Sequence, residues 1–567
     1  MSFYSSLFHM KSRKDLHEDS LYRLSHEPCM PALQALRTDQ SIHHQTAAER
    51  EHNNKLASPN NFNVKKSIYR IPSSGRRLRT IAAVTALIGS VGLSGCASFE
   101  GIGSDRTIAQ PTDFATRQSL ADPAQGGAGQ WPGSDWVRQF GDEQLVALID
   151  EALTSNPGLQ QARARIAAAG AIAESRGAPL LPSVTADASF TRNQFSATTI
   201  YPAPYGGNWY NEKKAMLNIG YELDLWNKNH AALAQAISNE KASQASEQEA
   251  RLVLTASIVS AYSQLATQYA LHDILQRTVD QRTALQTITG ERVRTGLDTQ
   301  IERDQSRSSS ADARAQLEQS EGQILLTRQQ LGALTGRGPD RGLQLAPPQA
   351  ARLVTLALPA ELPLNLLGRR PDIVAARWQV EAASQGIAVA RARFYPDINL
   401  SAMIGFDTLL NNNPFTAASK SIAFGPAISL PIFEGGALRA GLKGEYANYE
   451  LAVATYNRTL DEAYTEVARQ IAQIHSSQRQ LPIRREALEA AERAFQLARE
   501  RYRLGLVSQL TLLSAETAVL AQRQAMVTLE AARRDQQIAL FKALGGGFEA
   551  GQAGLALNAP GAAARTP

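Results

Sequence analysis

Four stretches of the chain alternate, residue by residue, between apolar side chains and polar or small ones. Each run is about 9–11 residues long, which predicts a β-strand with one apolar side. The apolar positions are Val184, Ala186, Ala188 and Phe190; Leu217, Ile219, Tyr221, Leu223 and Leu225; Ile398, Leu400, Ala402, Ile404 and Phe406; and Ile422, Phe424, Pro426, Ile428, Leu430 and Ile432. This pattern suits a strand of a membrane β-barrel, and it also suits a strand in an ordinary half-buried sheet. The predicted loop between the first two strands holds four aromatic residues, where an interfacial girdle would lie: Tyr201, Tyr205, Trp209 and Tyr210.

Most of the remaining chain has the period of long helices. No proline occurs from 205 to 338, and residues 228–295 place apolar side chains at helical spacing, for example Leu254, Ile258 and Leu265. As one helix this stretch would be ~100 Å long at 1.5 Å per residue. The equivalent stretch, 436–504, contains Pro482, where we expect a kink or a break. Helices of this length need lateral partners, so the local prediction is two antiparallel coiled-coil hairpins.

Each predicted hairpin closes with a short turn. In the first, Gly296 suits the left-handed position that ends a helix, and Thr299 with Glu302 forms a capping box for the return helix. In the second, Gly505 has the same place and Ser508 can cap the return helix. Each half of the chain is therefore predicted as helix, strand, strand, long helix, tight turn and return helix.

The two halves are copies of one unit. Matching segments recur at offsets of 209–214 residues, such as Glu291-Arg-Val-Arg-Thr-Gly296 and Glu500-Arg-Tyr-Arg-Leu-Gly505. A period of about 210 residues is too long for a solenoid, so it indicates a tandem duplication. The divisions that we predict are a disordered leader or over-extended start (1–75), a lipoprotein signal peptide (76–95), a lipidated N-terminal segment (96–140), a first repeat (141–336), a Pro-rich linker (337–363), a second repeat (364–548) and a disordered tail (549–567).

The prediction of a signal peptide is based on three consecutive segments: a positively charged one, an apolar one and one of small residues. Arg76, Arg77 and Arg79 precede an apolar run, and Leu93-Ser94-Gly95-Cys96 follows it. This ending resembles the bacterial lipobox, which implies that Cys96 takes a diacylglycerol and an N-acyl chain and becomes the mature N-terminus. A short anchor helix with an incidental cysteine is the alternative. The residues after Cys96 are Ala and Ser rather than the Asp that retains lipoproteins at the inner membrane, which favours the outer membrane.

Charge and composition remove several classes of function. The chain has 58 Lys and Arg against 53 Asp and Glu, but the excess lies in residues 1–95, and the remainder carries a net charge of −1. The basic balance therefore predicts no nucleic-acid partner. After cleavage only Cys96 is left of the two cysteines, so there is no disulfide and no thiolate metal site. His230, His272 and His475 are isolated, and no nucleophile elbow, phosphate loop or dinucleotide fingerprint occurs, so we predict no enzyme, no metal and no cofactor besides the acyl chains.

Counting strands decides the architecture. Open sheet edges are not tolerated in lipid, and single-chain barrels begin at eight strands, whereas this chain offers four. If the strands enter a bilayer, several copies must share one barrel. Twelve strands from three chains is the simplest closure that leaves a lumen; counting alone also allows a dimer with eight strands.

Several ordered motifs resemble those of the TolC-type outer-membrane factors, and most of all the NodT/OprM-like lipoprotein branch. They are Leu-Leu-Pro-Ser-Val, Tyr221-Glu-Leu-Asp-Leu-Trp226, Arg369-Arg-Pro-Asp-Ile373, Pro431-Ile-Phe-Glu-Gly-Gly436 and the two glycine turns. The resemblance covers about 96–548. It implies an α+β membrane protein that forms, as a homotrimer, a 12-stranded outer-membrane β-barrel continued by a long α-helical periplasmic tunnel, with a mixed equatorial domain. It also implies a periplasmic adaptor and an inner-membrane pump of the resistance-nodulation-division type as partners.

The resemblance further implies that the hairpin turns constrict the periplasmic end of the tunnel until an adaptor docks. The matching positions are Arg294, Asp298 and Thr299 at the first turn and Arg503, Val507 and Ser508 at the second. Ordinary capping and solvation would explain the same residues. The second turn has no carboxylate, which departs from the acidic tips of the family and favours a mixed apolar and hydrogen-bonded closure.

The expected function is thus a passive exit duct for efflux, spanning the outer membrane of a Gram-negative bacterium. Two alternatives stay open: a lipid-anchored periplasmic coiled-coil adaptor, and an outer-membrane channel of type I secretion. An adaptor would have one hairpin per chain and would lack four strands of membrane length. The sequence does not separate drugs, metals and proteins as cargo, because the pump largely chooses it.

Overall fold

The computed structural model describes residues 99, 101–115, 119, 131–198, 200, 203–348, 362–409 and 413–557. The chain divides into two units, Met1–Leu78 and Arg79–Pro567, and every described residue lies in the second. The predicted leader, the signal peptide, Cys96, residues 349–361 of the linker and residues 558–567 of the tail lie outside the described residues.

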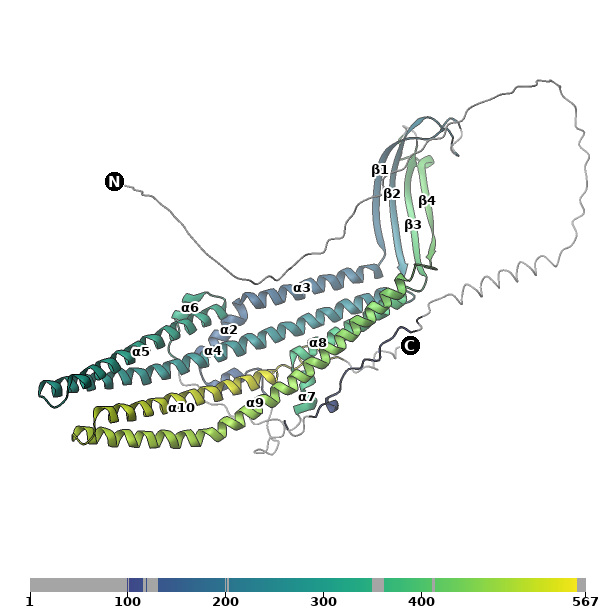
Figure 1. Cartoon of the computed structure of the whole chain (residues 1–567). Coiled ribbons are helices and arrows are strands. Elements are labelled where there is room, and N and C mark those ends of the chain that lie inside the picture. Colours follow the sequence, from purple (N-terminus) through teal and green to yellow (C-terminus); the bar gives the residue numbers. More distant parts are fainter. Residues whose placement is uncertain are drawn as a thin grey trace, which may run out of the picture. The chain divides into compact units, whose positions relative to one another are not determined.

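The same order of elements occurs twice (Figure 1). The first half contains α2 (Glu143–Ser155), α3 (Pro157–Gly177), β1 (Ser183–Gln194), β2 (Trp209–Leu223), α4 (Lys228–Arg294) and α5 (Gln300–Thr335). The second half contains α7 (Leu362–Arg369), α8 (Pro371–Ala392), β3 (Asp397–Thr408), β4 (Lys420–Ser429), α9 (Ala437–Arg503) and α10 (Gln509–Ala543). Short turns of helix lie at η1 (Pro111–Asp113), η2 (Trp136–Phe140), η3 (Ala178–Leu180), α6 (Pro339–Leu343) and η4 (Ala417–Ser419). This is the predicted order, with a short leading helix in each half, α2 and α7, that the sequence analysis did not predict.

The four strands form one antiparallel sheet in the order β1-β2-β3-β4 (Figure 1). Their register aligns apolar positions in two rows, Ala186, Leu217, Ile404 and Ile422, and Val184, Ile219, Ala402 and Phe424. Successive side chains along a strand point to opposite faces, so both rows lie on one face. The opposite face carries small and polar residues, for example the row Ser183, Gly220, Ser401 and Gly425. The alternation in the sequence therefore becomes one apolar and one polar face.

Two aromatic residues of the predicted loop lie in a strand instead. β2 begins at Trp209, so Trp209 and Tyr210 are its first two residues and pair with β1. Tyr205 stays in the loop, where its ring lies 5.4 Å from the ring of Tyr210. Tyr201 lies outside the described residues. The strand begins earlier than predicted because residues 209–214 do not alternate between apolar and polar side chains but still pair with β1, which periodicity alone does not detect.

The long helices form two hairpins, α4 with α5 and α9 with α10. α4 lies against α3, α5, α8 and α10, and α9 lies against α8 and α10 (Figure 1). We expected a kink or a break at Pro482. No break occurs, because α9 is one helix from Ala437 to Arg503 with Pro482 inside it. Figure 1 shows α9 bending part-way along its length. Packing of α9 on both sides of the proline maintains the helix despite the lost hydrogen bond.

The largest core joins the two halves and the N-terminal segment. The ring of Trp136 stacks on that of Phe541 from α10, with centroids 4.9 Å apart. Leu145 of α2 and Tyr262 of α4, both 1 % exposed, belong to the same cluster. Folding of either half alone would leave part of this core exposed.

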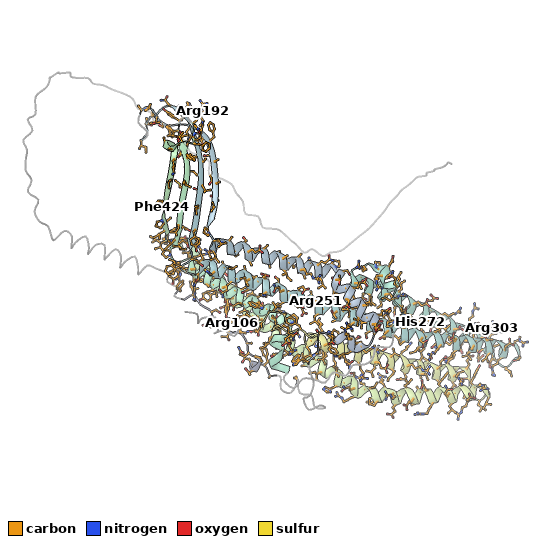
Figure 2. The ribbon with its side chains drawn as sticks, turned by 180° about the vertical axis from the view of Figure 1, so that it is seen from behind. Arg106, Arg192, Arg251, His272, Arg303 and Phe424 are labelled. Carbon is orange, nitrogen blue, oxygen red and sulfur yellow. The ribbon has the colours of Figure 1, made fainter. Side chains whose placement is uncertain are left out.

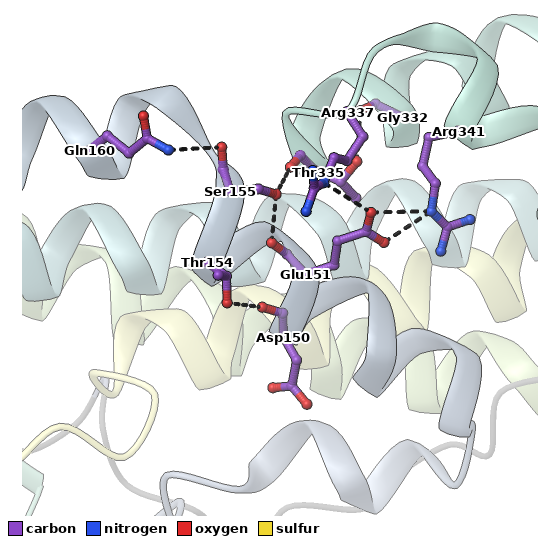
Figure 3. Close-up of polar contacts among 9 residues, drawn as sticks. All are labelled: Asp150, Glu151, Thr154, Ser155, Gln160, Gly332, Thr335, Arg337 and Arg341. Carbon is purple, nitrogen blue, oxygen red and sulfur yellow. Dashed lines mark hydrogen bonds and ion pairs between the residues drawn. The ribbon is translucent and has the colours of Figure 1, made fainter.

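Near this core, polar contacts join the beginning of each half to the end of its return helix. In the first half, Glu151 of α2 accepts a hydrogen bond from Arg341 at 2.9 Å and pairs with Arg337 at 3.5 Å (Figure 3). Ser155 donates to the carbonyl oxygen of Thr335 at the end of α5, at 2.6 Å. In the second half, Arg370 donates to the carbonyl oxygen of Ala543, the last residue of α10, at 3.1 Å. The Arg-Arg-Pro-Asp motif thus caps the end of the return helix.

The chain after α10 passes through a narrow space. Gly545, Gly546 and Gly547 have φ of 87°, 56° and 84°. A Cβ on Gly545 would lie 1.7 Å from the carbonyl oxygen of Arg369. Residues 549–557, predicted as part of a disordered tail, are packed here instead: Leu555 is 2 % exposed, and its carbonyl oxygen accepts from Trp378 Nε1 at 3.0 Å. The prediction of a disordered tail is therefore wrong for residues 549–557.

Candidate functional site at the hairpin tips

The first tip, between α4 and α5, has the predicted turn and cap. Gly296 has φ of 76°, and the amide of Leu297 donates to the carbonyl oxygen of Arg292 at 2.8 Å, which closes the end of α4. Thr299 accepts from the amide of Ile301 at 3.2 Å, and its own amide donates to Glu302 at 2.9 Å. These hydrogen bonds lower the pKa of the Glu302 carboxyl, the side-chain bond from Thr299 having the largest effect. The capping box is therefore present.

Asp298 is bound within its own turn. Arg292 donates to both of its carboxylate oxygens, from Nε at 2.8 Å and from a terminal nitrogen at 3.1 Å. The hydrogen bond to Asp298 raises the pKa of Arg292, so the guanidinium is charged at neutral pH. The side chain of Asp298 is 12 % exposed, so it presents little charge to solvent.

Arg292 also reaches the second hairpin. Its guanidinium carbon lies 5.4 Å from the ring centroid of Tyr502 in the last turn of α9. Cations over aromatic faces at this distance attract the ring. Asp298 holds Arg292, and Arg292 covers Tyr502, so the three residues connect the two tips. The sequence analysis missed Arg292 and Tyr502, although both lie in the Glu-Arg-x-Arg-x-Gly segment that identified the repeat.

The second tip, between α9 and α10, is more apolar. Gly505 has φ of 70°, and the amide of Leu506 donates to the carbonyl oxygen of Arg501 at 2.9 Å, as in the first tip. Ser508 accepts from the amide of Thr511 at 3.4 Å. Val507 packs against a small cluster in which Leu285, Tyr502 and Leu512 are buried. This turn is therefore held by apolar packing and hydrogen bonds, and its part in closing a tunnel stays a prediction.

The two predicted arginines do not join this connection. Arg294 pairs with Glu291 at 2.7 Å, and Arg503 pairs with Glu500 at 3.2 Å, each within its own helix. Both arginine side chains are more than 70 % exposed, so these pairs contribute little to stability. Of the six predicted tip residues, the structure brings Asp298 and Val507 into contacts that connect or pack the tips.

The ends of both tips carry exposed apolar side chains. Leu297 and Ile301 of the first tip are each 67 % exposed. Leu504, Leu506 and Leu510 of the second tip are 72 %, 69 % and 63 % exposed. Several large apolar residues in one place mark a surface suited to contact with another protein. We refer to these five residues as the apolar tip surface.

Two other features are absent from the described residues. Within the described part of the chain, no group of three or more His, Cys, Asp or Glu side chains is arranged to hold a metal ion. None of the described helices is both long and apolar enough to cross a membrane. Cys96, the predicted lipidation site, is not among these residues.

Comparison with known families decides between the channel and the adaptor. The outer membrane efflux protein family matches residues 148–337 and 362–546, one match for each half of the chain. The chain belongs to this family. The prediction of an efflux exit duct and of its resemblance to the outer-membrane factors is thereby confirmed. The family consists of transport ducts rather than enzymes, and its relatives are outer-membrane proteins.

Individual relatives agree with the family. The chain is 30 % identical to the multidrug resistance outer membrane protein MdtP of Escherichia coli over 485 residues, 84 % of this chain and 98 % of that protein. It is 36 % identical to the fusaric acid resistance protein FusA of Burkholderia cepacia over 64 % of this chain and 68 % of that protein. Among solved structures, the outer membrane protein VceC of Vibrio cholerae is similar with a TM-score of 0.70 and 35 % identity, covering 74 % of this chain and all of VceC. The fold of this efflux protein is therefore mostly helical with one sheet, as predicted in outline.

Proposed function

We propose that three copies of this efflux protein form one continuous duct, with a 12-stranded barrel in the outer membrane, a helical tunnel through the periplasm and a mixed equatorial domain around it. The observation that carries the proposal is the sheet. Its apolar face is uncovered: Val184, Ile422 and Phe424 are 61 %, 54 % and 84 % exposed (Figure 2). Lipid would cover such a face, and the small and polar residues of the other face would line a lumen.

The edges of the sheet support the trimer. Among the described strands, β1 pairs only with β2, and β4 pairs only with β3. Both edges thus present unpaired backbone groups, which a bilayer does not tolerate. Pairing of β1 from one copy with β4 of the next would remove every edge, and three copies would supply twelve strands.

The contacts of Phe99 support a lipid anchor on Cys96. The ring of Phe99 packs edge-on against that of Phe394, with centroids 5.2 Å apart, and Phe394 lies three residues before β3. Three residues of chain reach at most about 11 Å. A diacylglycerol and an N-acyl chain on Cys96 would therefore begin near the end of the sheet that joins the helices. Two or more acyl chains give stable anchoring there.

The tips would be the periplasmic entrance, opposite the barrel. The apolar tip surface offers the contact area for a periplasmic adaptor, which would connect the duct to an inner-membrane pump of the resistance-nodulation-division type. The duct itself would be passive, with the energy for transport supplied by the pump at the inner membrane. When the duct is not transporting, its entrance would be kept closed by the contacts of Arg292 with Asp298 and with Tyr502.

The test is the oligomeric mass, in detergent, of the mature protein extracted from outer membranes. We expect a trimer that resists dissociation. A stable dimer would replace the twelve-stranded barrel by one of eight strands. A stable monomer could not close a barrel from four strands and would favour the lipid-anchored adaptor.

A further inference from the structure

Charged side chains are sorted between the two faces of the sheet. The register assigns every strand residue to the apolar or to the polar face, because successive side chains point to opposite sides. Along the four described strands, the apolar face carries no acidic side chain and three basic ones: Arg192, Lys213 and Lys420. The polar face carries five carboxylates and one lysine: Asp187, Glu212, Glu222, Asp397, Asp407 and Lys214. We refer to Arg192, Lys213 and Lys420 as the basic girdle.

The basic girdle lies at one depth along the sheet. Arg192 is nine residues from Ser183, where β1 meets the helical part, and Lys420 is nine residues from Ser429, the corresponding end of β4. Lys213 is ten residues from the corresponding end of β2. Nine residues span ~31 Å along a strand, which becomes ~23 Å across a membrane when the strands tilt by about 40°. Because the apolar band of membrane barrels is ~25 Å tall, the girdle would lie at one boundary of this band.

Aromatic side chains mark the same level as a membrane boundary. Phe190 pairs with Lys213 in the register of the sheet, and the ring of Trp209 lies 5.5 Å from the guanidinium carbon of Arg192. Aromatic residues flank the apolar band of membrane barrels at both interfaces. Figure 2 shows Arg192 at the end of the sheet that lies away from the helices. With the helices in the periplasm, this end would lie in the outer leaflet.

The basic girdle has no anionic partner among the described residues. By contrast Lys214, the neighbour of Lys213 on the polar face, pairs with Glu212 and, at 3.5 Å, with Asp407. Arg192 and Lys213 are diagonal neighbours on adjacent strands, which places them about 7–8 Å apart. Like charges at this distance repel, and they do so more strongly beside a bilayer than in water, because the dielectric constant is lower. An anion between these side chains would remove the repulsion.

The proposed trimer would bring the girdles of neighbouring copies together. Arg192 lies on β1 and Lys420 lies on β4, which are the two edge strands of the sheet. Because both residues are equally far from the helical part, pairing of β4 with β1 of the next copy would place Lys420 near Arg192 of that copy. The girdle would then continue around the barrel as a positive ring.

We propose that the basic girdle binds the phosphate groups of lipopolysaccharide, the phosphorylated glycolipid of the outer leaflet. Arginine binds phosphate through paired hydrogen bonds, and lysine binds it as a point charge. The glycolipid carries a phosphate at each end of its lipid A disaccharide, so one molecule can reach cations on separate strands, and its acyl chains would cover the apolar face. This inference rests on the proposed function for the direction of the barrel in the membrane.

Native mass spectrometry of the purified oligomer in detergent measures the binding. The probes are lipid A with both phosphates, lipid A with one phosphate, and phosphatidylglycerol. We expect lipid A with both phosphates to bind about tenfold more tightly than phosphatidylglycerol, with the singly phosphorylated form between them. Phosphatidylglycerol that binds as tightly as lipid A would overturn the assignment to the glycolipid.

Substitutions test whether the girdle is the site. R192Q/K213Q/K420Q removes its charge, and K214Q is the matched control, because Lys214 is adjacent to Lys213 but lies on the polar face. We expect the triple variant to bind lipid A about tenfold more weakly, and K214Q to bind it as the parent does. R192K/K213R/K420R keeps the charges and should keep the affinity. Equal affinities of the triple variant and the parent would overturn the proposal.

A single substitution covers the case in which the triple variant does not assemble. K213Q should lower the affinity for lipid A about threefold, and K214Q should leave it unchanged. The same affinity in K213Q and K214Q would count against the girdle as the site.

Thermal dissociation tests the position of the glycolipid between copies. A ligand that binds the assembled state stabilises it by mass action. Lipid A should therefore raise the temperature at which the parent oligomer dissociates and should leave that of R192Q/K213Q/K420Q unchanged. No shift in the parent would overturn the placement of the glycolipid between copies.

The oligomeric mass separates this inference from the proposed function. A trimer whose affinity for lipid A ignores the girdle substitutions would keep the duct and refute the glycolipid site. A monomer or dimer whose affinity still depends on the girdle would refute the twelve-stranded barrel and keep the site on this face of the sheet.

Discussion

The guanidinium of Arg292 is shared between Asp298, which it binds through two hydrogen bonds of 2.8 and 3.1 Å, and the ring of Tyr502, which lies 5.4 Å away on the other hairpin. Asp298 thus acts on the second hairpin only through Arg292. The contribution of a cation over a ring is about 0.5–1 kcal/mol at exposed sites. A change of that size alters the ratio of two conformations about two- to fivefold.

Asp298→Ala should raise the conductance of the channel at rest. Without the carboxylate, Arg292 loses the partner that orients it over Tyr502, and we expect the fraction of open channels to increase about two- to fivefold. Single-channel recording in planar bilayers measures this fraction. Glu291→Ala is the control, because it removes the exposed partner of Arg294 and leaves the connection intact. An unchanged leak in Asp298→Ala would remove Asp298 from the closure.

Tyr502 offers a sharper comparison. Its hydroxyl has no hydrogen-bond partner among the described residues, so Tyr502→Phe keeps everything that Arg292 contacts. We expect Tyr502→Phe to leave the resting conductance unchanged and Tyr502→Leu to raise it as much as Asp298→Ala. A double variant, Asp298→Ala with Tyr502→Leu, should add little to either one, because both act on the same contact. If the effects of Asp298→Ala and Tyr502→Leu on the resting conductance were fully additive in the double variant, the two residues would not act through the same contact.

Local patterns predicted most of the fold. The alternation of Val184 to Phe190 and of Ile398 to Phe406 identified strands, and the spacing of Leu254, Ile258 and Leu265 identified α4. The glycine turns followed from residue chemistry, since φ above +20° favours glycine. These features depend on neighbours in the sequence, which is why one sequence suffices to predict them.

Contacts between the hairpins could not be predicted in this way. Arg292 and Tyr502 lie on different hairpins, and their meeting depends on which face of α4 turns toward the second hairpin. The same holds for Arg282 of α4 and Glu516 of α10, whose side chains lie 3.6 Å apart. At Pro482 the local signal allowed a kink or a break, and only the structure shows that α9 continues through the proline as one helix. The site was therefore located by its turns, but the residues that connect its two parts required the structure.

The caps of the two return helices differ in strength. Thr299 caps α5 with reciprocal hydrogen bonds, whereas Ser508 accepts one bond of 3.4 Å at the start of α10. Loss of a threonine cap costs about 1 kcal/mol, which should raise amide exchange in the first turn of α5 about fivefold in Thr299→Ala. We expect a smaller increase in the first turn of α10 in Ser508→Ala. Hydrogen exchange with mass spectrometry resolves both turns, and equal effects would argue against the reciprocal cap.

That cap also depends on pH. Its hydrogen bonds lower the pKa of Glu302 below the value in the unfolded chain. The stabilisation is thus fully present above the unfolded pKa and is lost as the pH falls through the folded pKa. The protection factor of amides in the first turn of α5, which is the ratio of the intrinsic to the observed exchange rate, should fall on acidification. Glu302→Gln should remove this dependence.

A substitution at Gly545 tests how closely the chain after α10 packs against Arg369. A side chain there would meet the carbonyl oxygen of Arg369 at 1.7 Å, and φ of 87° is strained for any residue with a Cβ. We expect Gly545→Ala to lower the melting temperature and the yield of assembled protein from membranes. Gly551→Ala is the matched control, since nothing lies within 4 Å of its Cβ position. A normal yield and melting temperature for Gly545→Ala would mean that this passage is wider than the contacts indicate.

The lipid anchor is tested by the two cysteines of the chain. Cys96→Ser should abolish incorporation of radiolabelled palmitate, because serine lacks the thiol that receives the diacylglycerol. Cys29→Ser should keep full incorporation, since Cys29 belongs to the segment that the proposed cleavage before Cys96 would remove. Phe99→Ala probes the packing of the adjoining chain. Labelling should persist, while the ring contact of 5.2 Å with Phe394 is lost and Ile102 is left to pack this segment against the same cluster. We therefore expect faster proteolysis of the N-terminal segment in Phe99→Ala, and labelled palmitate on Cys96→Ser would refute the anchor itself.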